Sequence, residues 1–518
     1  MPPNPLAWPS GGAQTGVRDV VVVGGGTAGW MSALMSREFL PGARVTVVES
    51  KETSILGVGE GTTPQFVTGF LDTVGIPVSR LVREAGATIK NCFKHTDWNG
   101  DGAAYYHPFA DQVTPEPDIA FLHPDRPWAE ADIAFPARAC ERNRVVLARR
   151  ATSDIDPAAD PLSHLQPRGA FALHFDAVRL AGLLAREGVA RGVVRVEQTC
   201  VGFDQAANGN VTSVRLADGR ALPCDLLFDC SGFARLVLGK LLEAPWRDVS
   251  ASLPCSRAIP FFVDNKGDTP TYSESIAMRH GWLWVIPVQG RLGCGYVFDS
   301  RFVSDDTARA ELVERFGPGL NTPRAIDFSA GWSTRPWMHN CVAIGVAAGF
   351  LEPLEATSIW TSVLALNQFF RTGLPTADEA SRDAFNQWFG VLHQRSADFV
   401  YLHYLGRRRD TPFWSTFRDR TVMPEAVRKA LGEGGVREWF GDPHDRAGNP
   451  NPFNWASWMH VARGTGNLDR QALARCWDYY GLWTGFDERA AAQRARIEAE
   501  VDRCLLHDDC LRFLAGGA

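Results

Sequence analysis

The chain has 518 residues and a formal net charge of −6, with 45% hydrophobic and 22% charged residues. This composition is typical of a globular protein with a sizeable core, and it offers no basic footprint for nucleic acid. No apolar run is long enough to span a membrane, and the eleven cysteines include no C-x-x-C pair, which argues against a zinc site and favours a reducing cytoplasm. We therefore expect no metal, nucleic acid or membrane partner, and the sequence leaves open whether the chain forms a homodimer.

Three regions are expected along the chain. Residues 1–16 are rich in Pro and Gly and are predicted to be a flexible tail, not a signal peptide. Residues 17–415 carry the motifs described below, and residues 416–518 are predicted to be mainly helical and rich in tryptophan.

A glycine turn between a strand and a helix is the first motif. An apolar strand that ends at Val23 runs into a G-x-G-x-x-G sequence, a helical stripe follows, and a second strand ends in Glu49. The glycines let the backbone approach a pyrophosphate, and Glu49 can accept a hydrogen bond from a ribose hydroxyl. This context predicts a dinucleotide site in an α/β fold, without separating NAD from FAD. The predicted cofactor contacts here are Gly24, Gly26, Thr27, Ala28, Gly29 and Glu49.

A second glycine-rich loop spans residues 57–64. It is either a plain connection or a backbone that passes close to a ligand, because residues without a Cβ allow close approach. Its candidate cofactor contacts are Gly57, Val58, Gly59 and Glu60.

Residues 86–98 are predicted to form a strand that contains Lys90. The apolar positions depart from strict period two, so a bulge or bend is expected. An isolated lysine is far more often a solvated surface group than a catalyst. An aromatic patch at 105–109 follows, and it either walls a pocket or belongs to the core.

The middle of the chain is predicted to complete the first sheet. Strands are expected at 193–196 and 211–216, joined by a turn at 208–210. An apolar strand at 224–230 is expected to lie beside the first strand, by analogy with other dinucleotide-binding folds. Since no second strand-linked G-x-G-x-x-G occurs, we expect one dinucleotide site.

A hairpin is predicted around residues 289–291, and its first strand carries Trp282 and Trp284 on one face. Paired aromatics at period two are common in packed sheets, so the plain interpretation is a sheet-face cluster.

Glu355 lies just before a helix predicted from the apolar residues that follow it. Pro353 excludes a continuous helix through this point. The unpaired N–H groups near Thr357 and Ser358 could bind a small anion. Taken alone, however, Glu355 is best interpreted as a carboxylate that complements the helix dipole.

Together, four stretches resemble the flavin-dependent tryptophan halogenases and their relatives that act on free indoles and other aromatics. These stretches are the glycine turn at 24–29, the loop at 57–64, a W-x-W-x-I-P sequence at 282–287 and the segment 350–355. The W-x-W-x-I-P residues are Trp282, Trp284, Ile286 and Pro287.

The resemblance implies an FAD-binding, Rossmann-like fold of the two-dinucleotide-binding type, with a fused substrate region and a helical C-terminal part over the substrate site. It implies that FADH2, oxygen and chloride or bromide give hypohalous acid, which halogenates an electron-rich aromatic such as indole. A separate NAD(P)H-dependent flavin reductase would supply the FADH2. The alternatives are an FAD-dependent aromatic monooxygenase and a flavin-binding protein without catalysis.

The resemblance also implies roles for single residues. Lys90 matches the lysine that holds the halogenating species, either by a hydrogen bond or as a haloamine. Glu355 matches the glutamate that stabilises the cationic arene and can take its proton. The further residues implied are Gly345 and Leu354 for the cofactor, Thr357 and Ser358 for the halide, and His107, Pro108, Phe109, Trp455 and Trp458 for the substrate.

The chain departs from this family in three places. Many members have Glu-Ser-Thr-Gly where this chain has residues 355–358, and Ala356 and Ser358 therefore leave the halide preference open. The groups that hold the amino-acid end of tryptophan are not recognisable around Trp458, which favours a free indole-like substrate. Gly345 is followed by Val346 and not by the Asp usual in flavin hydroxylases.

Overall fold

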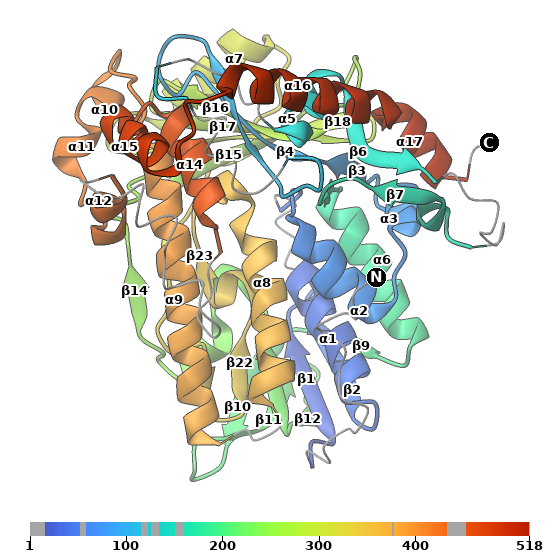
Figure 1. The fold of residues 1–518 in the computed structure, drawn as a ribbon. Coiled ribbons are helices and arrows are strands. Elements are labelled where there is room, and N and C mark those ends of the chain that lie inside the picture. Colours follow the sequence, from blue (N-terminus) through green and yellow to red (C-terminus); the bar gives the residue numbers. More distant parts are fainter. Residues whose placement is uncertain are drawn as a thin grey trace.

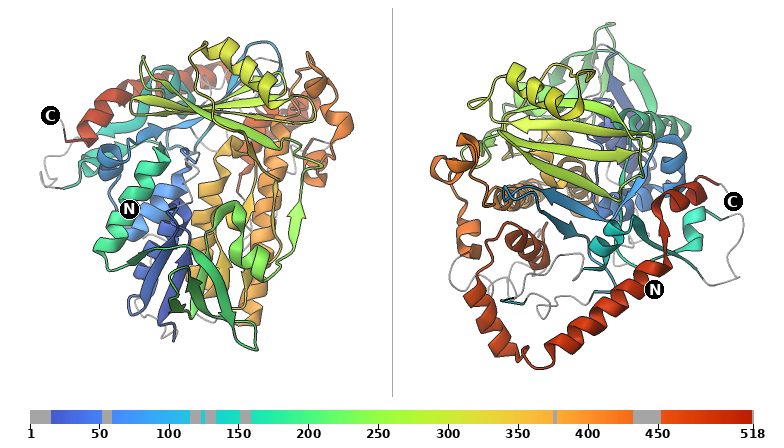
Figure 2. Two further views of the ribbon diagram at one scale, coloured as in Figure 1. Left: turned by 180° about the vertical axis from the view of Figure 1, so that it is seen from behind. Right: turned by 90° about the horizontal axis from the view of Figure 1, so that it is seen from above.

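A six-stranded sheet and a seven-stranded sheet form the frame of the protein (Figures 1 and 2). The structure is a computed structural model that describes residues 16–51, 59–114, 123–125, 134–150, 159–374, 378–431 and 452–516. Almost all of the predicted tail at 1–16, together with Gly57 and Val58, lies outside these residues.

The six-stranded sheet carries the glycine turn. Its order is β21 (Trp337–Met338), β22 (Cys341–Ala343), β13 (Leu226–Asp229), β1 (Asp19–Val23), β2 (Arg44–Glu49) and β9 (Val194–Glu197). All neighbours are parallel except β21 and β22. Residues 20–23 are at most 3% exposed, as expected for a strand covered on both faces. The prediction that the 224–230 strand lies beside the first strand is confirmed by the pairing of β13 with β1.

One predicted connection is wrong. The turn at 208–210 joins β10 (Cys200–Gln205) to β11 (Val211–Leu216), and β11 continues its antiparallel sheet with β12 (Ala221–Pro223). The strand at 193–196 instead becomes β9, at the edge of the six-stranded sheet. The strand β10 was missed because its residues are largely exposed and lack an apolar alternation.

The seven-stranded sheet has the order β19 (Ile326–Asp327), β15 (Arg257–Asp264), β18 (Arg291–Phe298), β17 (Gly281–Val288), β16 (Tyr272–Met278), β4 (Cys92–Thr96) and β5 (Ala104–Pro108). The predicted hairpin is β17 and β18. The predicted strand at 86–98 bends at Asn91 and contributes to two sheets, since β3 (Thr88–Lys90) pairs with β8 (Ala172–His174).

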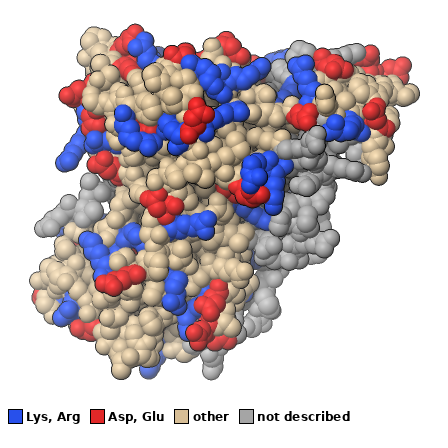
Figure 3. Space-filling view, turned by 90° about the vertical axis from the view of Figure 1, so that its left-hand side faces the viewer, with Lys and Arg blue, Asp and Glu red and all other residues tan. Residues whose placement is uncertain are grey.

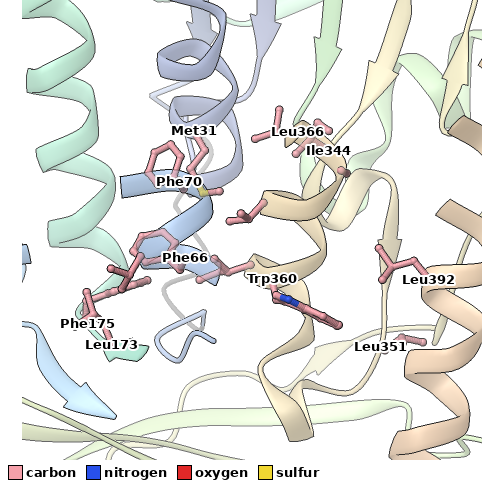
Figure 4. Close-up of a cluster of buried hydrophobic side chains, with 14 of the residues drawn as sticks. Met31, Phe66, Phe70, Leu173, Phe175, Ile344, Leu351, Trp360, Leu366 and Leu392 are labelled. Atoms are coloured by element: carbon pink, nitrogen blue, oxygen red, sulfur yellow. The ribbon is translucent and has the colours of Figure 1, made fainter. Parts of the chain in front are cut away.

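Helices fill the space between and around the sheets. α1 (Thr27–Phe39) and α6 (Ala177–Ala190) pack against each other, and α8 (Thr357–Gln368) lies beside α9 (Glu379–His403) in Figure 1. Figure 4 shows part of the core that joins them: Phe66 and Phe70 of η1 (Phe66–Leu71) lie on the side of α8 that faces Met31 of α1, and Leu392 of α9 lies on the other side of α8.

The described residues after 415 are mainly helical, as predicted. The end of this region also pairs with a strand from the first half of the chain. Its elements are α11 (Phe417–Arg420), α12 (Glu425–Leu431), α14 (Trp455–Gly464), α15 (Arg470–Tyr480), α16 (Phe486–Arg503), β24 (Cys504–Leu506) and α17 (His507–Leu514). β24 pairs with β6 (Arg144–Arg149), and α16 runs along one side of the molecule in the right-hand view of Figure 2.

The remaining elements are short, apart from α7. They are α2 (Asp72–Val74), α3 (Val78–Glu84), α5 (Phe135–Glu141), η3 (Pro161–His164), β7 (Leu165–Pro167), η4 (Gly232–Ala234), η5 (Leu236–Leu241), β14 (Trp246–Asp248), α7 (Asp305–Phe316), β20 (Gly331–Ser333), η6 (Gly345–Ala347), β23 (Gly349–Phe350), η7 (Pro353–Glu355), η8 (Phe369–Gly373) and α10 (Pro412–Ser415). Among them, β14, β20 and β23 form a three-stranded sheet, while β7 pairs with β6.

The surface carries charges of both signs. On the face drawn in Figure 3, the basic and acidic side chains of the described residues are interspersed and form no extended patch of one sign. Among the helices of the described ranges, none is both long enough and apolar enough to cross a bilayer.

Candidate active site

A cavity of about 820 Å³ opens between the six-stranded and seven-stranded sheets. It contains both the glycine turn and the tryptophan pair, which are about 260 residues apart in the sequence. The predicted cofactor residues that line it are Gly24, Gly26, Thr27, Ala28, Glu49, Gly59, Glu60, Gly345 and Leu354. A single cavity of this size can hold a dinucleotide across the carboxyl end of the parallel sheet.

The glycine turn has the geometry that this binding requires. Gly24 has φ of +119°, and a Cβ there would overlap the carbonyl group of Cys230 on the neighbouring strand. Gly29 does not line the cavity but packs so closely that a Cβ would overlap the carbonyl group of Gly24. The turn therefore holds α1 with its N-terminus toward the cavity, where backbone N–H groups can bind a phosphate.

Glu49 ends β2 at the cavity and forms an ion pair with Arg195 of β9. Its carboxylate is 15% exposed, so it can still accept a hydrogen bond from a ligand. If the cavity binds FAD, as the resemblance implies, Glu49→Gln should weaken that binding about tenfold, because a hydrogen bond to a charged acceptor contributes about 1.5–3 kcal/mol. Flavin fluorescence titration of the protein measures this change. Glu38→Gln, at an exposed position of α1, should leave the affinity unchanged.

The tryptophan pair forms part of the cavity wall. Trp282, Trp284 and Ile286 line it, and the two indole rings lie 6.3 Å apart. Pro287 lies outside the lining, and its carbonyl oxygen accepts a hydrogen bond from Thr88 Oγ1 at 2.7 Å. The two large rings take up room on this side of the cavity, which leaves less space for an organic substrate there.

Glu352 is hydrogen-bonded to Trp282 of the tryptophan pair. Its Oε2 accepts hydrogen bonds from Trp282 Nε1 at 3.0 Å and from the Tyr404 hydroxyl. The carboxyl group is fully buried, and burial raises its pKa to about 7 despite these two donors.

A stability prediction follows for Glu352. Its pKa is raised in the folded state, so the folded protein loses stability as pH rises from about 4.5 to about 7, because over this range the unfolded chain releases the proton while the folded state still holds it. The difference of about 2.5 pKa units corresponds to about 3 kcal/mol. Relative to wild type, Glu352→Gln should therefore be more stable at pH 8 than at pH 5. Thermal unfolding at the two pH values tests this, and an equal difference in Tm at both would contradict it.

Lys90 is completely buried, at the end of β3. Its Nζ donates a hydrogen bond to the Thr62 carbonyl at 3.0 Å and lies 3.2 Å from the centre of the Phe93 ring and 5.6 Å from that of Phe109. Burial holds the pKa of Lys90 well below its usual range, although the nearby Glu355 carboxylate opposes this effect. The plain interpretation as a solvated surface lysine is therefore wrong. The bend at Asn91 allows Lys90 to point inward while β4 continues in the other sheet.

Glu355 is also completely buried, and three histidines surround its carboxylate. Oε1 lies 3.1 Å from His95 Nε2 and 2.9 Å from His403 Nε2, and Oε2 lies 2.9 Å from His107 Nδ1. Burial alone would raise the pKa of Glu355, but the attraction of His107 and the hydrogen bonds from all three histidines hold it well below its usual range. The group is thus an ionised carboxylate that is buried but hydrogen-bonded by three imidazole rings.

The histidines come from three separate elements, β4, β5 and α9. The ligand atoms of His95, His403 and Glu355 lie within 4.8 Å of one another, so this group could also hold a metal ion. The sequence did not predict this cluster. Its hydrogen bonds to the carboxylate account for the arrangement without a metal.

Several aromatic rings pack near Lys90 and Glu355. The rings of Phe93 and His107 stack at 5.8 Å, and Phe93 meets Phe109 edge-on at 5.8 Å. His107 also faces Phe453, and Phe453 stacks on Phe399 at 3.9 Å. His107 therefore lies beside Glu355, Phe109 lies near Lys90, and Phe93 contacts both of these rings. Such a wall suits a flat, electron-rich ring.

The other predicted substrate residues have no described contact with Lys90 or Glu355. Pro108 ends β5, and Trp458 of α14 contacts Phe399 at 5.6 Å between ring centres. Trp455 begins α14, and its side chain lies outside the described part of the structure.

The predicted halide residues lie at the start of α8. Ala356 precedes the helix with φ of +52°, a left-handed conformation that costs a residue with a Cβ some free energy. Thr357 is 2% exposed and its Oγ1 has no hydrogen-bond partner among the described residues, and Ser358 lines the cavity. The N-terminus of this twelve-residue helix therefore opens toward the cavity, where an anion would be stabilised.

Three residues of this site were missed by the sequence reasoning: His95, His403 and Ser275. His95 could have been noticed, because it lies two residues after Phe93 and so on the same face of its strand. Nothing local marks His403, near the end of a 25-residue helix, as a partner of Glu355.

Comparison with known proteins provides an independent assignment. The family profile described as tryptophan halogenase matches residues 19–477. The tryptophan 7-halogenase KtzQ of Kutzneria sp. (strain 744) is 33% identical over 440 residues, covering 78% of this chain and 79% of KtzQ. The tryptophan 7-halogenase RebH of Lentzea aerocolonigenes is 34% identical over 421 residues, covering 76% and 78%. The solved structure of Xcc4156, a flavin-dependent halogenase from Xanthomonas campestris, superposes with a TM-score of 0.81 at 29% identity and covers 96% of this chain and 98% of its own.

Proposed function

Because this chain belongs to the tryptophan halogenase family and is a flavin-dependent halogenase, we propose that it halogenates a free indole-like arene with Lys90 and Glu355 as its catalytic residues. The observation that carries this proposal is the pair itself. Lys90 and Glu355 are both completely buried and close enough for the carboxylate to act on the pKa of the amine, and the Phe93 ring packs against Lys90 while His107 contacts Glu355.

The residues around the large cavity fit FAD. Residues 24–26 have no Cβ atoms where a pyrophosphate would approach, Glu49 lines the cavity and would accept a hydrogen bond from a ribose hydroxyl, and the N-terminus of α8 opens toward the same cavity. Bound FADH2 would supply the electrons with which oxygen and halide give a hypohalous acid. Thr357 and Ser358 would bind the halide before this step.

Lys90 would receive the halogenating species from the cavity side. Phe93 lines the cavity and also lies directly under Lys90 Nζ, so Lys90 is one ring away from the cofactor space. The lowered pKa means that Nζ has a lone pair in a larger share of molecules than for an exposed lysine, which supports a covalent haloamine over simple hydrogen bonding. That reaction replaces one N–H hydrogen with halogen and releases water.

Glu355 would act on the arene as the halogen is transferred. The cationic ring formed by halogen transfer is stabilised by a nearby carboxylate in a site without water, and the carboxylate can then take the ring proton. His107 both donates to Glu355 and stacks on Phe93, and it thereby fixes the carboxylate relative to the substrate wall.

The substrate class rests on the absence of recognisable groups for an amino-acid end near Trp458. The named relatives KtzQ and RebH are tryptophan halogenases. The test is a single-turnover reaction in which FAD is reduced without oxygen and then mixed with oxygen, bromide and either indole or tryptophan. We expect bromoindole by mass spectrometry and less bromotryptophan. A hydroxylated product, or no halogenated product from either compound, would contradict the proposal.

A separate flavin reductase should supply FADH2, since the sequence has one strand-linked dinucleotide fingerprint. We expect the purified protein with FAD to leave NADH unoxidised, and halogenation to begin when a NADH-dependent flavin reductase is added. Absorbance at 340 nm measures the first result. NADH oxidation by the purified protein alone would show that a nicotinamide site was missed.

A further inference from the structure

A row of side chains across three strands holds His95 against Glu355. The parallel pairing of β16 with β4 puts Ser275 beside His95, and the antiparallel pairing of β4 with β5 puts Tyr105 on its other side. The His95 and Tyr105 rings stack at 4.8 Å with their planes 19° apart. Side chains directly opposite on neighbouring strands share a face, so this register fixes the imidazole ring.

Both nitrogens of His95 have hydrogen-bond partners. Ser275 Oγ lies 2.6 Å from Nδ1, and Glu355 Oε1 lies 3.1 Å from Nε2. All three side chains are buried, with exposures of 4% for Ser275 and 0% for the other two. Burial lowers the pKa of His95 to about 4, so at neutral pH the ring carries a single N–H.

Ser275 can determine whether the single N–H of His95 lies on Nδ1 or on Nε2. An ionised carboxylate only accepts, so Nε2 must carry the hydrogen to bind Glu355, and Nδ1 must then accept from the Ser275 hydroxyl. In the other tautomer, an unprotonated Nε2 would face the carboxylate. Two acceptors would then be buried against each other, which favours a protonated Glu355.

We propose that Ser275 and His95 are positioning residues for the halogenation reaction: Ser275 selects the Nε2–H tautomer of His95, which keeps Glu355 ionised and oriented as a base. This proposal rests on the proposed role of Glu355. Because Ser275 also lines the cofactor cavity, the arrangement links the cofactor side of the protein to its proton acceptor.

Other groups also face Glu355, and the contribution of Ser275 and His95 has to be distinguished from theirs. His107 from β5 donates to Oε2, His403 from α9 contacts Oε1, and Lys90 from β3 acts on the carboxylate through its charge. His403 Nδ1 faces the Phe399 carbonyl at 3.0 Å, so its other nitrogen is held toward Glu355 by the helix backbone. Among the three histidines, His95 has a side-chain hydroxyl as its second partner, and a single substitution can therefore release its tautomer.

The first measurement uses the protein without substrate. Long-range ¹H–¹⁵N spectra of histidine-labelled protein distinguish the two tautomers, and the His95 signal is identified by its loss in His95→Gln. We expect the Nε2–H tautomer in wild type and in Ser275→Thr, and a mixture in Ser275→Ala. An unchanged tautomer in Ser275→Ala would overturn the proposal whatever the role of Glu355.

The second measurement is the pH profile of kcat for indole bromination. In Ser275→Ala, the loss of kcat toward low pH should begin at a higher pH than in wild type. The ratio of kcat at pH 6 to kcat at pH 8 should be about threefold or more lower in this variant than in wild type. KM should change little. Ser275→Thr should restore the profile, and His95→Gln, which keeps an N–H donor, should lose less activity than His95→Phe.

A matched control lies two residues away on the same strand. Ser273 Oγ contacts His174 Nε2 at 2.9 Å and does not contact Glu355. Ser273→Ala should therefore leave the acid side of the pH profile where it is in wild type. An equal shift in both alanine variants would overturn the proposal. A tautomer change in Ser275→Ala without a change in the pH profile would instead show that Glu355 is not the base.

Discussion

Replacing Lys90 with methionine should reduce halogenation by at least about 100-fold, the usual contribution of a positioned catalytic group. The amine lies 3.2 Å from the centre of the Phe93 ring at the cavity wall and 5.6 Å from that of Phe109. Methionine fills a similar volume and has no polar atom to desolvate, so the variant should fold and unfold at a temperature equal to or above that of wild type. Product analysis after single turnover measures the first effect, and thermal unfolding measures the second.

Two comparisons make this result specific to the site. Lys429→Met, at a position of α12 whose side chain is 67% exposed, should leave the rate and the product unchanged. Flavin binding by Lys90→Met should stay close to wild type, because Lys90 does not line the cofactor cavity. If Lys90→Met halogenated indole at the native rate, the halogenating species would have to reach the substrate without the amine.

The cofactor half of this site could be predicted because its signals are local. The valine run at 20–23, the glycine turn and the acid at Glu49 each follow from a few neighbouring residues, and the structure places them at one cavity. A strand that is buried on both faces requires apolar residues, and a backbone φ of +119° favours glycine. Both features can therefore be recognised from the residue types alone.

The chemistry half depends on contacts that no local pattern encodes. Lys90 is buried because the strand bends at Asn91 and enters a second sheet. The departure from strict apolar alternation predicted the bend but not the burial of Lys90. The carboxylate of Glu355 meets residues that are 48, 248 and 260 positions away in the sequence. Only the resemblance to a family linked Glu355 with Lys90. His107 was expected as a substrate residue and not as a partner of Glu355, and nothing in the sequence predicted that His95 and His403 contact the carboxylate.

Replacing Glu355 with glutamine should cost about 100-fold or more in arene halogenation, while halogenating species should still form. Glutamine has no charge to stabilise the cationic ring and cannot take its proton. Its NH2 group would also face at least one of the histidine donors, so the new side chain is poorly matched to its surroundings. Glu355→Asp keeps the charge but withdraws it by one methylene, and it should retain intermediate activity.

The decisive measurement separates formation of the oxidant from its use. With reduced flavin, oxygen and bromide, a small added scavenger that reacts with free hypobromous acid should be brominated by Glu355→Gln at a rate similar to or above wild type, while bromoindole falls sharply. Glu311→Gln, which changes a buried glutamate bonded to Tyr296 in another part of the protein, should leave bromoindole formation unchanged. If Glu355→Gln lost scavenger bromination and bromoindole together, Glu355 would be needed before halogen transfer, and its role as the arene base would be wrong.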